Sequence, residues 1–150
     1  EQQIKKRGLN IYFGGTFSGN SMTTFFAKEY LLYLRKNKKK VFSYLEKISQ
    51  KFESHINLFC IKNNIDVKVY RFFSMIRLIY SSNKDIHDKS SRDFFEKKKS
   101  KDIEKLKSFL IKNKINYPKN GIIFFSYSSS TKNLLYIIKQ FEKGLKKFFS

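Results

Sequence analysis

The chain has 150 residues and a formal net charge of +20, with 32 Lys and Arg against 12 Asp and Glu. Its hydrophobic fraction of 41% and its 17 Phe exclude a disordered chain and predict one domain, or one piece of a larger domain, with a packed core. The sequence contains no run of about eighteen apolar residues, so we expect no membrane span.

Periodic apolar positions predict the secondary structure in chain order. The lysine-rich stretch at 36–40, Lys36-Asn37-Lys38-Lys39-Lys40, separates the first two predicted helices. The polar stretch at 81–100 is predicted to be a long loop, with at most one helical turn at Asp93–Phe95. The expected order is helix (22–34), helix (41–62), strand (67–73), strand (75–80), helix (101–113), strand (122–127) and helix (from 131). A few strands covered by helices on one side form an α+β layer.

The positive charge allows two interpretations. A strongly basic chain is typical of proteins that bind nucleic acid or anionic membranes. Here the charge comes nearly all from Lys, whereas Arg is preferred for bidentate contacts with phosphates or bases. The chain is also rich in Ile, Asn, Phe and Tyr, which have AT-rich codons, so a biased genome explains the lysines without a ligand. We favour codon bias and keep a basic nucleic-acid-binding protein without catalytic role as the alternative.

Cysteine and histidine point to no catalytic or metal chemistry of their own. The single cysteine, Cys60, lies among apolar residues, which predicts a small buried side chain. The two histidines, His55 and His87, are far apart and lack the spacing of metal ligands. The unpaired cysteine and the polar first residues, without the apolar stretch of a signal peptide, favour a reducing cytoplasm.

The loop from Gly14 to Asn20 carries the most chemical information. Its two adjacent glycines allow the backbone to approach a ligand closely, and the hydroxyl of Thr16 and free N–H groups can bind a phosphate. The helix that begins directly afterwards adds the positive end of its dipole. By composition alone, such a loop is more often a plain connection with a helix cap, and it lacks the Gly-Lys-Ser/Thr of a Walker loop.

Gly15-Thr16-Phe17-Ser18-Gly19-Asn20 resembles the GT-x-S-G-N-P signature of class III pyridoxal-phosphate (PLP) aminotransferases, especially glutamate-1-semialdehyde 2,1-aminomutases. Later segments are similar in the same order. Ser74 and Met75 match the family's Gly-Ser-Met-Phe-like hairpin. Tyr117-Pro118 and Phe124–Ser130 match the turn and the strand end that follow. The resemblance therefore covers nearly the whole chain.

This resemblance implies a fold, a cofactor and partners. Residues 1–24 would end the large cofactor-binding domain, and residues 25–150 would form the C-terminal small domain of a fold-type-I PLP-dependent transferase, a few-stranded sheet covered by helices. PLP would be shared across a dimer, with Thr16 on its phosphate and Gly15 and Phe17 shaping the loop. The partner would be a second subunit or the missing N-terminal half. The reaction would be amino-group transfer on a small amino acid, of the kind that converts glutamate-1-semialdehyde to 5-aminolevulinate.

The sequence also departs from the family. Phe73 replaces a glycine of the hairpin, and Ser129 stands where the family has histidine. The lysine that holds PLP lies well upstream of the signature in the family, and Lys5 and Lys6 are too close to the loop to replace it. We therefore expect a chain that is inactive alone, as a fragment, one piece of a split enzyme or a degenerate structural remnant.

Substrate-binding residues are not assigned from the sequence. Arg71 and Arg77 lie in or near the hairpin, where a guanidinium can bind a substrate carboxylate. We favour a plain surface position for both.

Overall fold

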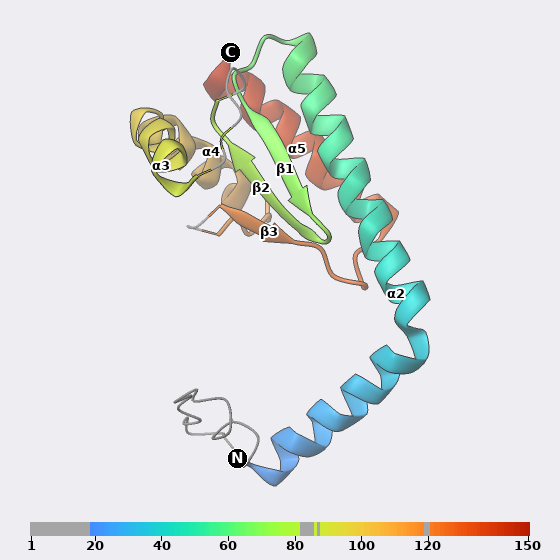
Figure 1. Cartoon of the computed structure of the whole chain (residues 1–150). Helices are drawn as coiled ribbons and strands as arrows, with labels where there is room; N and C mark the ends of the chain where they lie inside the picture. Colours follow the sequence, from blue (N-terminus) through green and yellow to red (C-terminus); the bar gives the residue numbers. More distant parts are fainter. Residues whose placement is uncertain (1–18, 82–85, 87, 119–120) are drawn as a thin grey trace. The chain divides into compact units, whose positions relative to one another are not determined.

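The computed structural model describes residues 19–81, 86, 88–118 and 121–150 (Figure 1). The chain divides into two units, residues 1–38 and 39–150, and each unit is described by itself. The described helices are α2 (Ser21–Lys62), α3 (Lys89–Lys98), α4 (Ser100–Lys112) and α5 (Thr131–Phe149), and the strands are β1 (Lys68–Phe72), β2 (Met75–Ile79) and β3 (Ile122–Phe124). The boundary between the units lies inside α2. It does not test the predicted domain boundary after residue 24, which stays a prediction.

The two helices predicted before Lys62 are a single helix, α2, and the predicted break at residues 36–40 is wrong. Lysine is a good helix former, so a run of lysines does not by itself end a helix. Asn20 starts α2, because its side-chain oxygen accepts a hydrogen bond from the backbone N–H of Thr23 at 3.1 Å. Asn64, with a φ of 53°, follows its end in the left-handed conformation that asparagine tolerates.

The three strands form an antiparallel sheet in the order β1-β2-β3. Val69 pairs with Leu78, and both side chains are almost completely buried on the same face as Ile76. Residues of the opposite face alternate with them along each strand. The strand predicted at 67–73 is confirmed as β1, while the third strand ends at Phe124, earlier than predicted.

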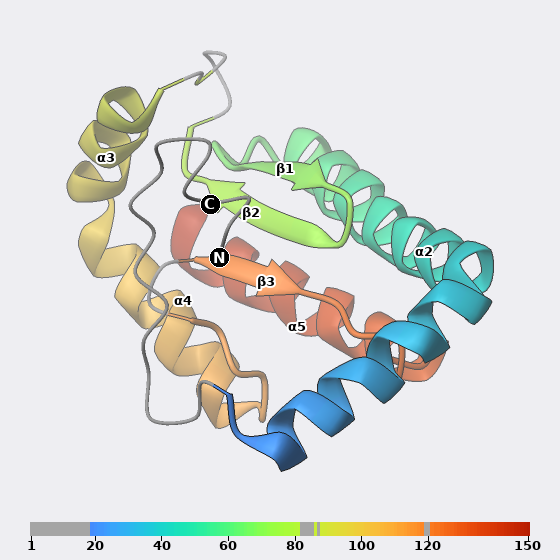
Figure 2. The same ribbon diagram turned by 60° about the horizontal axis from the view of Figure 1, so that its bottom comes forward.

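Helices cover the buried face of the sheet and complete the core of residues 39–150 (Figures 1 and 2). Phe52 of α2 and Phe141 of α5 are fully buried and meet edge to face, with ring centroids 5.3 Å apart. Phe52 also meets Phe125, which follows β3, at 5.6 Å. The core therefore joins the second part of α2, the sheet and α5.

The helix α4 packs closely against α5 at Gly144. A Cβ atom at Gly144 would lie 2.5 Å from Cδ1 of Leu106, a fully buried side chain of α4. Only glycine avoids that overlap, so the close approach of the two helices depends on this position.

The stretch at 81–100, predicted as a loop, contains α3 and the first residue of α4. Asp88 caps α3 by accepting a hydrogen bond from the N–H of Ser91 at 2.8 Å. The helix contacts the outer face of the sheet through an ion pair between Glu96 and Arg77 at 2.9 Å. The prediction failed because α3 has no buried residue, so its sequence carries no apolar period.

Two buried tyrosines make the stability of the fold sensitive to high pH. The hydroxyls of Tyr80 and Tyr117 lie 3.0 Å apart in the core. Burial raises the pKa of both, that of Tyr117 to about 12. Above pH 10 the unfolded chain loses these protons while the folded chain keeps them, so stability contributed by the pair declines between pH 10 and about 12.

We expect Tyr117→Phe to reduce this decline by about 2 kcal/mol at pH 11.5, relative to its value at pH 9. The measurement is urea unfolding of the native chain and the variant across that range. The other ionisable groups are common to both proteins, so the difference between the two curves isolates Tyr117. Tyr30→Phe, at an exposed position, is the control. Parallel curves for the native chain and Tyr117→Phe would show that burial does not perturb this phenol.

Candidate functional site

The predicted cofactor loop is only partly within the described residues. Gly15, Thr16 and Phe17 lie outside them, so their roles stay predictions. Gly19 and Asn20 are described: Gly19 has a φ of 78°, which favours glycine, and Asn20 caps α2. The first turn of α2 contains no acidic residue. Its start is therefore compatible with an anion at the end of the loop.

The β1–β2 connection is a tight turn at Phe73 and Ser74, closed by the pairing of Phe72 with Met75. Phe73 has a φ of 57°, the left-handed region that favours the glycine found in the family. The ring of Phe73 packs against Phe42 with centroids 6.0 Å apart. The substitution of glycine by Phe73 is thus accommodated, and the hairpin forms at the predicted place.

The hairpin turn lies beside the segment that leads from β3 to α5. The N–H of Phe125 donates to the carbonyl of Ser74 at 3.3 Å, and Met75 pairs with Phe124. We call residues 72–75 and 124–130 the hairpin end (Figure 1). The two segments, distant in sequence, were each singled out by the family resemblance, and the fold brings them together.

Tyr44 of α2 fastens the hairpin end to the core. Its hydroxyl donates to the carbonyl of Ser129, and its ring meets Tyr127 edge to face at 5.4 Å. The serine hydroxyls here serve the backbone: Ser126 accepts from the N–H of Ser128 at 3.2 Å, and Ser130 caps α5 by accepting from Asn133 at 3.1 Å. This segment offers hydroxyls, but no imidazole for proton transfer.

Arg71 pairs with two carboxylates of the same chain, and its side chain is partly buried. Its Nε lies 2.9 Å from Glu53 and its Nη1 lies 2.6 Å from Glu46, both on α2. The side chain is 18% exposed. The hydrogen bond with Glu53 raises the pKa of the guanidinium above its ordinary value. Arg71 therefore joins β1 to α2.

Arg77 lies on the opposite face of the sheet, next to the hairpin end. Its Nη2 pairs with Glu96, whereas its Nε is buried and has no hydrogen-bond partner among the residues that the structure describes. Within the same residues, the buried hydroxyl of Tyr70 also has no partner, and both side chains line a cavity of about 170 Å³ together with Phe72 and Met75. The sequence did not single out Tyr70, because a tyrosine in a strand is a common packing residue.

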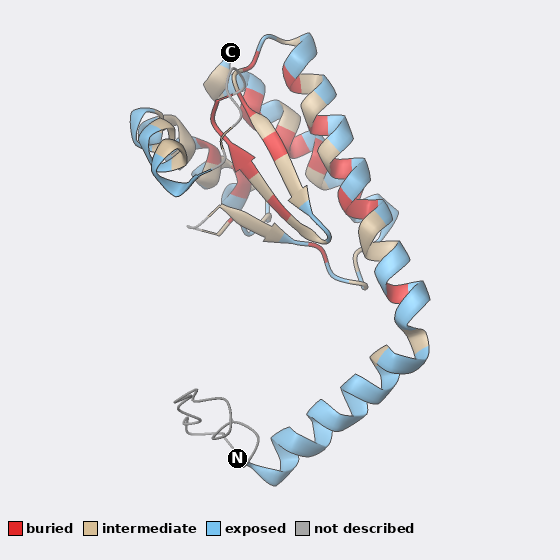
Figure 3. Cartoon of the chain, in the orientation of Figure 1, coloured by how far each residue is buried: buried red, intermediate tan, exposed pale blue. Residues whose placement is uncertain are grey.

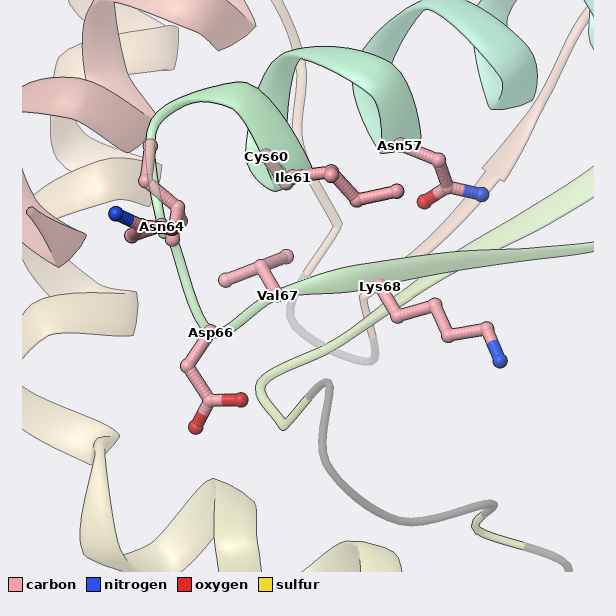
Figure 4. A pocket seen from close by; sticks show the side chains of 8 residues that line it. Asn57, Cys60, Ile61, Asn64, Asp66, Val67 and Lys68 are labelled. Atoms are coloured by element: carbon pink, nitrogen blue, oxygen red, sulfur yellow. The ribbon is translucent and has the colours of Figure 1, made fainter.

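A second cavity, of about 570 Å³, lies where α2 ends and β1 begins (Figure 4). The amide of Asn57 donates to the carbonyl of Val69 at 3.0 Å and accepts from its N–H at 2.7 Å, which satisfies the outer edge of β1. Cys60 is 2% exposed, and burial raises the pKa of its thiol to about 11. It stays protonated at neutral pH, so the predicted buried role is confirmed and the thiol is not a nucleophile.

His55 Nε2 lies within hydrogen-bond distance of Glu142 Oε1 of α5, at 3.0 Å, while His87 lies outside the described residues. Among the residues that the structure describes, no three or more His, Cys, Asp or Glu side chains gather where they could hold a metal ion. Within the same residues, no helix is long and apolar enough to cross a membrane.

Comparisons with known proteins identify the fold. No model of a known protein family matches the chain, and neither does any curated protein. An ω-transaminase from Sphaerobacter thermophilus is similar in structure, with a TM-score of 0.67 and 15% identity, over 91% of this chain and 30% of that one. A transaminase with PLP bound is similar over 92% of this chain and 30% of its own, with a TM-score of 0.64 and 16% identity. The chain thus spans less than a third of these proteins, and it has the α+β fold of one part of them.

Proposed function

We propose that the chain is the C-terminal part of a PLP-dependent aminotransferase and transfers no amino group until it is joined to a cofactor-binding part. The observation that carries this proposal is the likeness over 91% of this chain to a 30% share of an ω-transaminase. The partner is a second subunit or the missing N-terminal half of the same enzyme.

The hairpin end supports the proposal independently of overall fold. Two segments resembled the family's small domain, one around Ser74 and Met75 and the other from Phe124 to Ser130. They lie side by side, joined by the hydrogen bond from Phe125 to Ser74. In the proposed enzyme this end closes the substrate site, with the unpartnered Arg77 Nε and Tyr70 hydroxyl nearby.

The finer proposal is a reaction of the glutamate-1-semialdehyde aminomutase kind in the cytoplasm. It is supported by the order of the resembling segments. PLP, when bound, supplies an electron sink that stabilises negative charge on the substrate's amino-bearing carbon. This chain would hold its phosphate through Thr16, with Gly15 and Phe17 shaping the loop and the start of α2 adding a favourable dipole.

Thr16→Val tests the proposed phosphate contact. The chain is co-expressed with the polypeptide encoded upstream of Glu1, and PLP affinity and amino transfer are measured. Loss of the hydroxyl is expected to weaken PLP binding by about 1–3 kcal/mol, because a hydrogen bond to a charged phosphate is lost. Thr23→Val is the control, since the Thr23 hydroxyl is exposed and, within the part of the chain that the structure describes, contacts the side chain of Asn20 at 3.4 Å.

Two outcomes would contradict the proposal. Equal and negligible effects of both substitutions in a folded complex would mean that the loop is only a connection. Turnover by the chain alone, with PLP reducibly bound at one lysine, would show that no further part is needed.

A further inference from the structure

The first part of α2, from Met22 to Tyr33, exposes an unusual amount of apolar surface. Figure 3 shows this part of the helix almost entirely exposed, whereas the second part has a buried side. Seven large side chains are between 47% and 68% exposed: Met22, Phe25, Phe26, Tyr30, Leu31, Leu32 and Tyr33. Isolated exposed apolar residues are normal on proteins, but a dense group of this kind marks an interaction site.

These side chains lie on all sides of the helix. At about 100° per residue, Phe25, Tyr30 and Leu31 point in three directions separated by roughly 100–140°. They are 58%, 63% and 64% exposed. The second part of α2 differs, because its buried residues Val41, Ile48, Phe52 and Ile56 recur at steps of seven and four and form one stripe.

The distribution of apolar side chains limits what covers them. A helix that is apolar all round is buried within a larger protein or spans a membrane. The described helices include none suited to crossing a membrane. A membrane surface or a second copy packed side by side covers one side of a helix and leaves the others in water. The net charge of +20 also opposes pairing of two copies.

We infer that the cofactor-binding part of the aminotransferase surrounds residues 21–34 and takes this helix into its interior. The inference rests on the proposed function. The likeness to the ω-transaminase covers 91% of this chain, and residues 1–38 are about a quarter of it, so part of this unit lies within the matched region. The matched protein continues well beyond the match, which provides the polypeptide needed to enclose a helix.

The helix also indicates the chemistry of its surroundings. Thr24, Lys28 and Arg35 lie at neighbouring angles around the helix, whereas Glu29 lies between Phe25 and Met22 in angle. The enclosing part is therefore largely apolar, with carboxylates opposite Lys28 and Arg35 and a basic or hydrogen-bonding group opposite Glu29.

Hydrogen exchange measured on the whole chain tests which partner covers residues 21–34. Alone, the amides of residues 21–34 are expected to exchange fast at every protein concentration, because a short helix without packing is marginal in water. They should stay fast with vesicles of anionic phosphatidylglycerol, and become strongly protected when the chain is co-expressed with the polypeptide encoded upstream of Glu1. The inference would be overturned if these amides were protected in the dilute chain, or if their protection grew with protein concentration or appeared with vesicles. Fast exchange in the co-expressed sample would overturn it as well.

A matched pair of leucines tests the enclosure by substitution. Leu31→Ser is expected to weaken the association of this chain with the co-expressed polypeptide about 10-fold or more. Phe25→Ser and Tyr30→Ser, on the other sides of the helix, are expected to have effects of the same size. Leu58→Ser, at a similarly exposed leucine of the same helix, should change it less than about twofold. If only one of the three substitutions weakened the association, the partner would contact one side of the helix and would not enclose it. A protected helix without PLP binding would uphold the inference and refute the proposed function.

Discussion

Leu134→Ala is expected to lower the free energy of unfolding by about 2–5 kcal/mol, whereas Leu135→Ala should lower it by less than about 1 kcal/mol. Leu134 is 1% exposed and belongs to the core, while its neighbour Leu135 is 50% exposed. The same atoms are removed from the same helix in both variants. Only the first substitution leaves a cavity, so burial decides the difference.

Urea unfolding of the two variants, followed by circular dichroism, measures this difference. An Ala at either position changes the intrinsic helix preference by the same small amount, which cancels in the comparison. Equal losses at Leu134 and Leu135 would mean that the buried face of α5 is assigned wrongly.

Arg71→Met is expected to lower the free energy of unfolding by about 2–3 kcal/mol, the second largest effect. The guanidinium contacts Glu53 and Glu46 at once, and one oxygen of Glu46 is buried with no hydrogen-bond partner among the described residues. Methionine keeps much of the apolar stem but leaves two partly buried carboxylates facing each other. The expected loss is below that of a fully buried pair, because the glutamate side chains are 27% and 39% exposed.

Arg92→Met is the matched control for this pair. Arg92 is 23% exposed and contacts Asp93, but it lies on α3, which has no buried residue. Its loss should cost less than about 1 kcal/mol. A double-mutant cycle of Arg71→Met with Glu53→Gln measures the coupling directly, and a coupling energy near zero would rule out a stabilising ion pair.

Local sequence patterns predicted much of the fold. The sequence predicted a strand at 67–73, where β1 forms, and a helix from residue 131, where α5 begins with Ser130 as its cap. These signals are local: side chains alternate along a strand, and a hydroxyl caps the helix a few residues away. The signal fails for α3, whose side chains face no core.

The candidate site was predicted in pieces. Resemblance singled out Ser74 and Met75, and separately Phe124–Ser130, but it could not place Tyr44 or Tyr70 beside them. Tyr44 belongs to the site because its hydroxyl bonds to the distant Ser129, and Tyr70 because it lines the small cavity beside the hairpin end. No spacing along the chain records such a contact.

The sequence by itself determined the α+β class, the hairpin, the burial of Cys60 and the apolar character of the first part of α2. Only the tertiary structure decided that Arg71 faces two glutamates and that α5 approaches α4 at Gly144. The physical reason is the range of the forces involved. Periodicity and capping act between residues a few positions apart, whereas ion pairing and close packing depend on which distant side chains the fold brings within a few ångströms.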